Sequence, residues 1–102
     1  MRVLMFVLIA GLSGWAQAAD VAAGKTAYAV CTACHLADGA GSQSLNAPRL
    51  AGQEDWYLKR QLNAFKDGIR GAAAGDVPGS QMRPMAMTLT SEAAIDNVVA
   101  YI

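Results

Sequence analysis

Histidine and cysteine are nearly absent from this chain of 102 residues, which contains one histidine and two cysteines. All of them lie in a single run, Cys31-Thr32-Ala33-Cys34-His35. A structural zinc site needs four protein ligands, so this run would have to recruit a carboxylate in order to hold zinc. The shortage of histidine and cysteine therefore disfavours a zinc site. Any metal that these residue types bind must lie at residues 31–35.

The chain also lacks a long apolar run and an excess of charge of one sign. Lys and Arg together number eight, as do Asp and Glu, so the formal net charge is zero. Nothing in this balance suggests a nucleic-acid partner. The extended apolar stretch, residues 3–12, is shorter than the roughly 20 residues that a helix needs to span a bilayer.

The N-terminal segment is typical of an export signal. Met1 and Arg2 form a basic start, the apolar stretch follows, and Ala16-Gln17-Ala18 supplies the small residues that signal peptidase needs. We therefore predict a cleaved signal peptide over residues 1–18, a single domain over residues 19–102 and a periplasmic location. An uncleaved membrane anchor is the alternative, and after cleavage no stable membrane span would remain.

The run from Cys31 to His35 is the pattern of covalent c-type haem attachment. Two thiols three positions apart lie about one helical turn from each other, so both can reach the vinyl groups on one side of a porphyrin. His35 would then lie under the macrocycle and ligate the haem iron. A large apolar group would also substitute for side chains that so small a core lacks. A thioredoxin-like dithiol is disfavoured because no predicted strand precedes Cys31.

The sixth ligand of the iron must come from another residue type, because the chain has no second histidine. Three of the five methionines, Met82, Met85 and Met87, fall close together before the C-terminal segment. A soft thioether is the natural candidate for the ligand. Methionine also fills gaps in cores, so at least one of the three is expected to pack there. The residues alone leave open which methionine binds iron.

The remaining sequence predicts helices separated by loops. Three helices are expected, each preceded or begun by a capping or acidic residue. They cover about residues 21–31 after Asp20, 55–67 after Glu54, and 92–102 after Thr90 or Ser91. The stretch over residues 71–80 is predicted to be flexible because it contains glycine and proline. Basic residues on the middle helix are interpreted as an ordinary solvated face, with docking of an acidic redox partner as the alternative.

Several motifs together resemble those of class I c-type cytochromes, and within them the bacterial c-four and c-five kind. They are Gly24-x-x-x-Tyr28, Cys31-x-x-Cys34-His35, Pro48-x-Leu50-Ala51-Gly52-Gln53, Tyr57-Leu58 with Gln61-Leu62, Met82-x-Pro84-Met85 and Ala100-Tyr101. The resemblance covers essentially all of residues 19–102. It implies an all-α class I cytochrome c fold around one covalently bound haem. In that fold the first and last helices cross at right angles, and Gly24 and Tyr28 meet Tyr101.

The resemblance also implies roles for residues around the haem. Pro48 would offer its carbonyl oxygen to His35, and the middle helix would cover one haem edge. In similar sequences the methionine ligand stands seven residues before the leucine that precedes the last helix. Met82 has that spacing from Leu89, so it is favoured over Met85. Three further residues are suggested as haem neighbours: Arg49, Trp56 and Tyr57.

An iron held by His35 and a methionine has no open position for oxygen, peroxide or substrate. We therefore predict a one-electron carrier between respiratory redox proteins, such as a dehydrogenase, a reductase or an oxidase, and not an enzyme. One alternative is a haem-bearing relay subunit of a larger oxidase or dehydrogenase. A thiol-disulfide protein is the more distant alternative. The chain is expected to be a monomer or a weak dimer.

Overall fold

The fold is that of a computed structural model, which describes residue 11 and residues 18–102. The predicted signal peptide falls almost wholly outside the described residues, and its cleavage stays a prediction. Within residues 18–102 the regular elements are helices, with one isolated bridge between Ser42 and Ala47 and no strand. They are α1 (Val21–Tyr28), the 3₁₀ turn η1 (Ala29–Cys31), α2 (Thr32–His35), the 3₁₀ turn η2 (Gln43–Leu45), α3 (Asp55–Lys66), α4 (Val77–Met87) and α5 (Glu92–Tyr101). The predicted all-α class is confirmed.

The first and last helices begin at the caps that the sequence suggests. The carboxylate of Asp20 accepts a 3.0 Å hydrogen bond from the backbone N–H of Ala23 at the start of α1. At the start of α5 the hydroxyl of Ser91 accepts a 3.1 Å bond from the N–H of Ala94. Each cap satisfies one of the donors that a helix leaves unpaired at its first turn. Ser91, not Thr90, is therefore the cap of α5.

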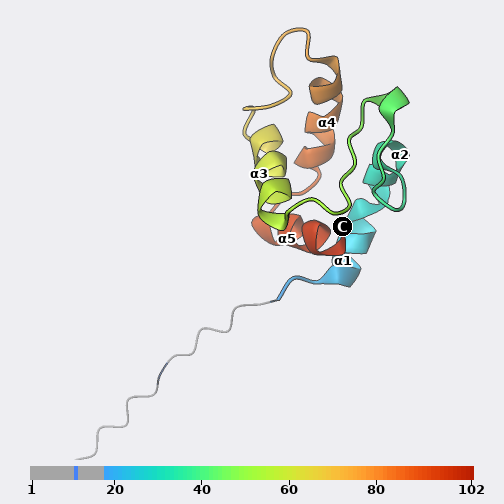
Figure 1. The fold of residues 1–102 in the computed structure, drawn as a ribbon. Coiled ribbons are helices and arrows are strands. Elements are labelled where there is room, and N and C mark those ends of the chain that lie inside the picture. The colour runs from blue at the N-terminus through green and yellow to red at the C-terminus, as the bar shows by residue number, and fades with distance from the viewer. Residues whose placement is uncertain (1–10, 12–17) are drawn as a thin grey trace, which may run out of the picture.

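Helices α1 and α5 cross in direct contact, as expected of this fold (Figure 1). A Cβ atom at Gly24 would lie 1.9 Å from the carbonyl oxygen of Asn97, so only glycine permits this approach. The rings of Tyr28 and Tyr101 pack 5.5 Å apart between their centroids, with 54° between their planes. The contact predicted among Gly24, Tyr28 and Tyr101 is confirmed.

The core lies where α5 meets α1 and α3. Ile95, Val98 and Val99 form one stripe of α5 and are at most 2% exposed. Tyr28 from α1, Leu58 from α3 and Leu89 before α5 complete the same buried cluster. The 3.6-residue period of an α-helix explains why these residues of α5 share a face. The burial of this apolar stripe stabilises the packing of α5 against α1 and α3.

The helix α4 differs from the sequence prediction, because it begins inside the stretch expected to be flexible. The carboxylate of Asp76 accepts a 2.9 Å hydrogen bond from the N–H of Gly79, which caps the helix. Pro78 occupies the first turn, where its missing N–H costs nothing. The guanidinium Nε of Arg83 donates a 3.0 Å bond to the carbonyl of Phe65 in α3. A local cap and a tertiary anchor thus outweigh the loop-like composition.

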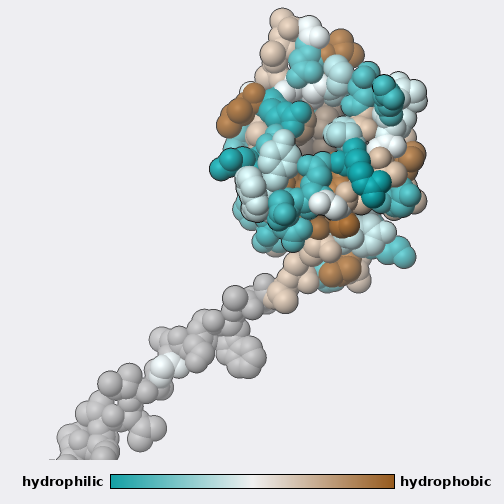
Figure 2. All heavy atoms as spheres, viewed as in Figure 1, coloured by the Kyte–Doolittle hydropathy of each residue, from teal (hydrophilic) through white to brown (hydrophobic). Residues whose placement is uncertain are grey.

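The elements leave a hollow on one face of the molecule. Helices α3 and α4 lie side by side, α5 runs beneath them, and α2 with the loop over residues 36–51 stands opposite (Figure 1). In the space-filling view the same face is hollowed near its centre, and both hydrophilic and hydrophobic residues surround the hollow (Figure 2). None of the helices among the described residues is long and apolar enough to cross a membrane.

Candidate haem site

The two cysteines lie at the junction of η1 and α2. Both are free thiols in the structure, Cys31 half-buried and Cys34 exposed. Burial, and then the neighbouring Cys34, raise the pKa of the Cys31 thiol above its usual range. Thiol-disulfide exchange requires a thiolate, which a raised pKa disfavours. The raised pKa makes Cys31 a poor nucleophile for that exchange, while the Cys34 thiol lies open at the surface.

The imidazole of His35 is held in a single orientation. Its side chain is 6% exposed, and its Nδ1–H donates a 2.9 Å hydrogen bond to the carbonyl oxygen of Pro48. The resemblance led us to expect this bond. Among the described residues Nε2 makes no hydrogen bond, yet it is not sealed from solvent. A carbonyl can only accept, so Nδ1 carries the proton and the lone pair of Nε2 is available to a metal.

The backbone around His35 is also fixed by hydrogen bonds. The carbonyl of His35 accepts a 3.0 Å bond from the N–H of Gly41. Leu36 has a positive φ of 68°, which is costly for a residue with a side chain. Its carbonyl accepts from the hydroxyl of Tyr28 at 2.7 Å and from the N–H of Gly39 at 3.1 Å. Sequence reasoning missed these contacts, because each joins residues that are several positions apart.

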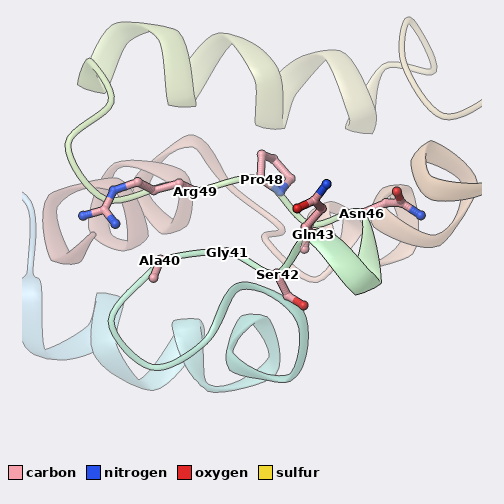
Figure 3. A pocket seen from close by; sticks show the side chains of 8 residues that line it. Ala40, Gly41, Ser42, Gln43, Asn46, Pro48 and Arg49 are labelled. Atoms are coloured by element: carbon pink, nitrogen blue, oxygen red, sulfur yellow. The ribbon is translucent and has the colours of Figure 1, made fainter.

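The loop that carries Pro48 folds back on itself. Ser42 and Ala47 exchange two backbone hydrogen bonds of 2.8 and 3.0 Å, and the N–H of Leu50 donates to the carbonyl of Gly39 at 2.8 Å. Residues 40–43 and 46–49 of this loop line an open, shallow depression of about 420 Å³, Pro48 among them (Figure 3). Neither cysteine lines this depression. The part of this loop in the site is to present the carbonyl of Pro48 to His35.

Two of the three clustered methionines lie one turn apart on α4. Met82 is half-buried, whereas Met85 is 38% exposed and Met87, at the end of the helix, is 51% exposed. Met82 is thus the one whose side chain the protein itself most shields from solvent. The assignment of Met82 as the sixth ligand, with Met85 as the runner-up, stays a prediction.

The three suggested haem neighbours lie on or near the surface. Arg49 is exposed, and its Nε donates a 3.0 Å bond to the carbonyl of Ala51. Trp56 is 60% exposed and carries the guanidinium of Arg60 at 5.5 Å from its ring centroid. Tyr57 meets Trp56 edge to face, with 5.9 Å between ring centroids. Contact of these residues with haem stays a prediction.

The residues present fit a covalently attached haem better than they fit a bare metal ion. The described residues include no group of three or more His, Cys, Asp or Glu side chains that could hold a metal ion. They do include two free thiols one turn apart and a fixed imidazole with an available Nε2. These are the groups that thioether attachment and axial ligation of a porphyrin iron require.

Comparison with known proteins agrees with this chemistry. A family model described as Cytochrome c matches residues 21–102. Cytochrome c4 of Pseudomonas aeruginosa is 52% identical over 65 residues, which make up 63% of this chain and 32% of that protein. Cytochrome c-554(548) of Halomonas halodenitrificans is 37% identical over 84 residues, or 82% of this chain and 94% of that protein. A protein of Thiomonas intermedia named thiosulfate dehydrogenase electron acceptor is 42% identical over 73 residues, or 72% of this chain and 34% of that protein.

The chain spans about a third of the length of the c4 relative and nearly all of the c-554(548) relative. The matched region begins with α1 and includes the run from Cys31 to His35. The chain therefore belongs to the cytochrome c family, as a class I c-type cytochrome of the c4 kind that carries covalently bound haem c and its iron.

Proposed function

We propose that this chain is a periplasmic one-electron carrier. Cys31 and Cys34 would hold the haem through thioether bonds, and His35 and Met82 would occupy the two axial positions of its iron. The observation that carries the proposal is the 2.9 Å hydrogen bond from Nδ1 of His35 to the Pro48 carbonyl, because it leaves Nε2 as the ligating atom. When bound, the haem supplies one-electron redox chemistry.

The residues of the chain each have a definite part in this proposal. The Pro48 carbonyl keeps the proton of His35 on Nδ1 and makes the imidazole a stronger donor through Nε2. The thioether of Met82 is a weaker donor than imidazole, which raises the reduction potential compared with ligation by two histidines. With both axial positions filled by side chains, no position is left for a substrate. The chain then exchanges electrons and does no further chemistry at the metal.

A relay subunit of a larger complex is the second candidate function. It is favoured by the name of one relative, a thiosulfate dehydrogenase electron acceptor. The two functions are distinguished by size-exclusion chromatography at low salt, applied to a soluble extract of cells that produce the protein. A carrier elutes as a free monomer or weak dimer, whereas a relay subunit elutes with a redox enzyme.

The closed iron is tested with carbon monoxide. The reduced protein at neutral pH is mixed with carbon monoxide and its absorption spectrum is followed. A spectrum that stays unchanged over minutes supports ligation by His35 and Met82. Rapid conversion to a carbon monoxide adduct would show an open position, and the electron-carrier proposal would then have to give way to a ligand-binding or catalytic one.

Export is tested on the protein itself. N-terminal sequencing of the protein recovered from the periplasm is expected to begin at Ala19, after removal of residues 1–18. A protein that begins at Met1 and remains with the membrane fraction would mean that the N-terminal segment is an anchor.

A further inference from the structure

We propose that Gly41 is a positioning residue for the iron ligand, which acts by holding the carbonyl of Pro48 against Nδ1 of His35. The proposal rests on the proposed function, because it concerns His35 as an axial ligand. It attributes to this glycine the close approach of two arms of the loop that follows the ligand. These arms are residues 39–42 and residues 47–50.

Gly41 touches the arm that carries Pro48. A Cβ atom at Gly41 would lie 2.6 Å from the carbonyl carbon of Pro48, 2.6 Å from the backbone nitrogen of Arg49 and 2.7 Å from the carbonyl oxygen of Ala47. All three are backbone atoms, so they cannot rotate away as the end of a flexible side chain could. Figure 3 shows Gly41 in one arm, facing Pro48 and Arg49 in the other. A side chain here must therefore push the Pro48 arm outward.

Gly41 is also tied to the ligand from the other side. Its backbone N–H donates a 3.0 Å hydrogen bond to the carbonyl oxygen of His35. Gly41 thus contacts the main chain of the residue that donates the Nδ1–H and the main chain of the residue that accepts it. The paired residues Ser42 and Ala47 lie next to this contact and close the loop. Gly41 therefore contacts both residues of the His35–Pro48 hydrogen bond and fixes the distance between them.

Two other glycines with positive φ, Gly52 and Gly75, lack this arrangement. Gly41 has φ +80°, and Gly52 and Gly75 have φ +83° and +84°. A Cβ atom at Gly52 or Gly75 would meet no atom within 4 Å. Those two positions need glycine for the backbone conformation alone. Position 41 requires glycine both for the positive φ and for the close approach to Pro48. Comparing it with position 52 therefore separates the effect of φ from the effect of the contact.

The chemical consequence follows from the basicity of the imidazole. A hydrogen bond from Nδ1–H to a carbonyl increases the electron density that Nε2 offers to iron, which favours the oxidised state. If Pro48 moves away, the imidazole becomes a weaker donor and the oxidised state loses that stabilisation. The reduction potential then becomes more positive.

The test compares Gly41→Ala with Gly52→Ala in the haem-loaded protein. Both variants place alanine at a positive φ, but only the first forces a contact with the Pro48 arm. For Gly41→Ala we expect the equilibrium constant for reduction to rise by roughly tenfold, about 59 mV for one electron. We also expect the NMR signal of the His35 Nδ1–H to shift or to be lost to exchange. Gly52→Ala should leave both unchanged. Equal effects of the two variants, or no effect of Gly41→Ala, would overturn the proposal.

A second measurement uses the unmutated protein and so does not depend on whether Gly41→Ala folds. Hydrogen exchange of the His35 Nδ1–H is compared with that of the backbone N–H groups of Ser42 and Ala47, which bond across the two arms, each corrected for its intrinsic rate. The proposal predicts one common opening free energy, because separation of the arms breaks all three bonds. An Nδ1–H that exchanges independently of the two amides contradicts it. If the purified protein contained no haem, that result would contradict the proposed function. The exchange measurement would still test whether Gly41 holds the arms together.

Discussion

The hydroxyl of Tyr28 donates a 2.7 Å hydrogen bond to the carbonyl of Leu36, the residue that directly follows His35. The ring of the same tyrosine is 2% exposed and packs against Tyr101 of α5. One side chain therefore joins the contact between the terminal helices to the turn that begins after His35. Leu36 is held at a positive φ, and this bond is one of those that stabilise the turn.

Replacing Tyr28 with phenylalanine separates these two contributions. Tyr28→Phe keeps the ring and its packing but removes the donor to Leu36, so we expect a loss of about 1 kcal/mol in the free energy of unfolding. Chemical denaturation of the haem-loaded protein measures it. Tyr101→Phe, at the other ring of the same pair, is the control and should change stability little, because its hydroxyl makes no hydrogen bond among the described residues. If both variants were equally stable, the hydroxyl of Tyr28 would have no structural role.

Stability is expected to fall at alkaline pH because of Tyr28. Burial is the largest cause that raises the pKa of the Tyr28 phenol above its usual value. Repulsion from the nearby ionisable groups of Cys31, Tyr101 and Asp38 raises it further. In the haem-loaded protein the Cys31 sulfur is a thioether and cannot ionise, so burial remains the leading cause. A raised pKa means that the folded state holds the proton more tightly than the unfolded state does. This stability is present below about pH 10 and is lost as the pH rises through the pKa of the folded state.

The pH dependence is measured as the free energy of unfolding between pH 8 and pH 11, values chosen to bracket the usual tyrosine pKa of about 10. The unmutated protein should lose more stability over this interval than Tyr28→Phe does, since only the former has this phenol to ionise. Parallel curves for the two proteins would mean that Tyr28 does not titrate differently in the folded and unfolded states.

The crossing of α1 and α5 should not tolerate a side chain at Gly24. In Gly24→Ala the new methyl group would meet the carbonyl oxygen of Asn97, so the helices must move apart. We expect a loss of about 3 kcal/mol in the free energy of unfolding, the upper end of the usual cost of overpacking. Lys25→Ala, an exposed position on the same helix, is the control and should be nearly neutral. A thermal melt that places both variants at the same temperature would contradict the close approach.

The helix starts could be predicted from the residues themselves, because capping residues act locally. Asp20 and Ser91 cap the helices that directly follow them. The expected contact of Gly24 with α5 and the expected bond from His35 to Pro48 came from the resemblance to a known family, and the structure contains both.

The features that the sequence did not predict depend on contacts between distant segments. Helix α4 contains two prolines, and its anchor is the bond from Arg83 to Phe65, which no local pattern indicates. The approach of Gly41 to Pro48 likewise appears only once the two arms of the loop meet. The composition of these segments indicates loops, and only tertiary contacts select the observed backbone.

The sixth ligand can be identified by single substitutions. Met82→Ala is expected to abolish the long-wavelength absorption band that arises from sulfur coordinated to oxidised haem iron, and to lower the reduction potential if another residue or water takes its place. Met85→Ala and Met87→Ala, both at exposed methionines, should keep the band. Loss of the band in Met85→Ala and its retention in Met82→Ala would transfer the role to Met85.

The central claim, that Cys31 and Cys34 bind haem covalently, is tested most directly by the mass of the exported protein after denaturation. The protein is produced in a host that attaches haem to exported cytochromes, unfolded in acid and measured intact. The account predicts residues 19–102 plus one haem, and loss of the haem from a variant that carries both Cys31→Ser and Cys34→Ser. A colourless polypeptide whose mass shows no haem and a disulfide between Cys31 and Cys34 would contradict it.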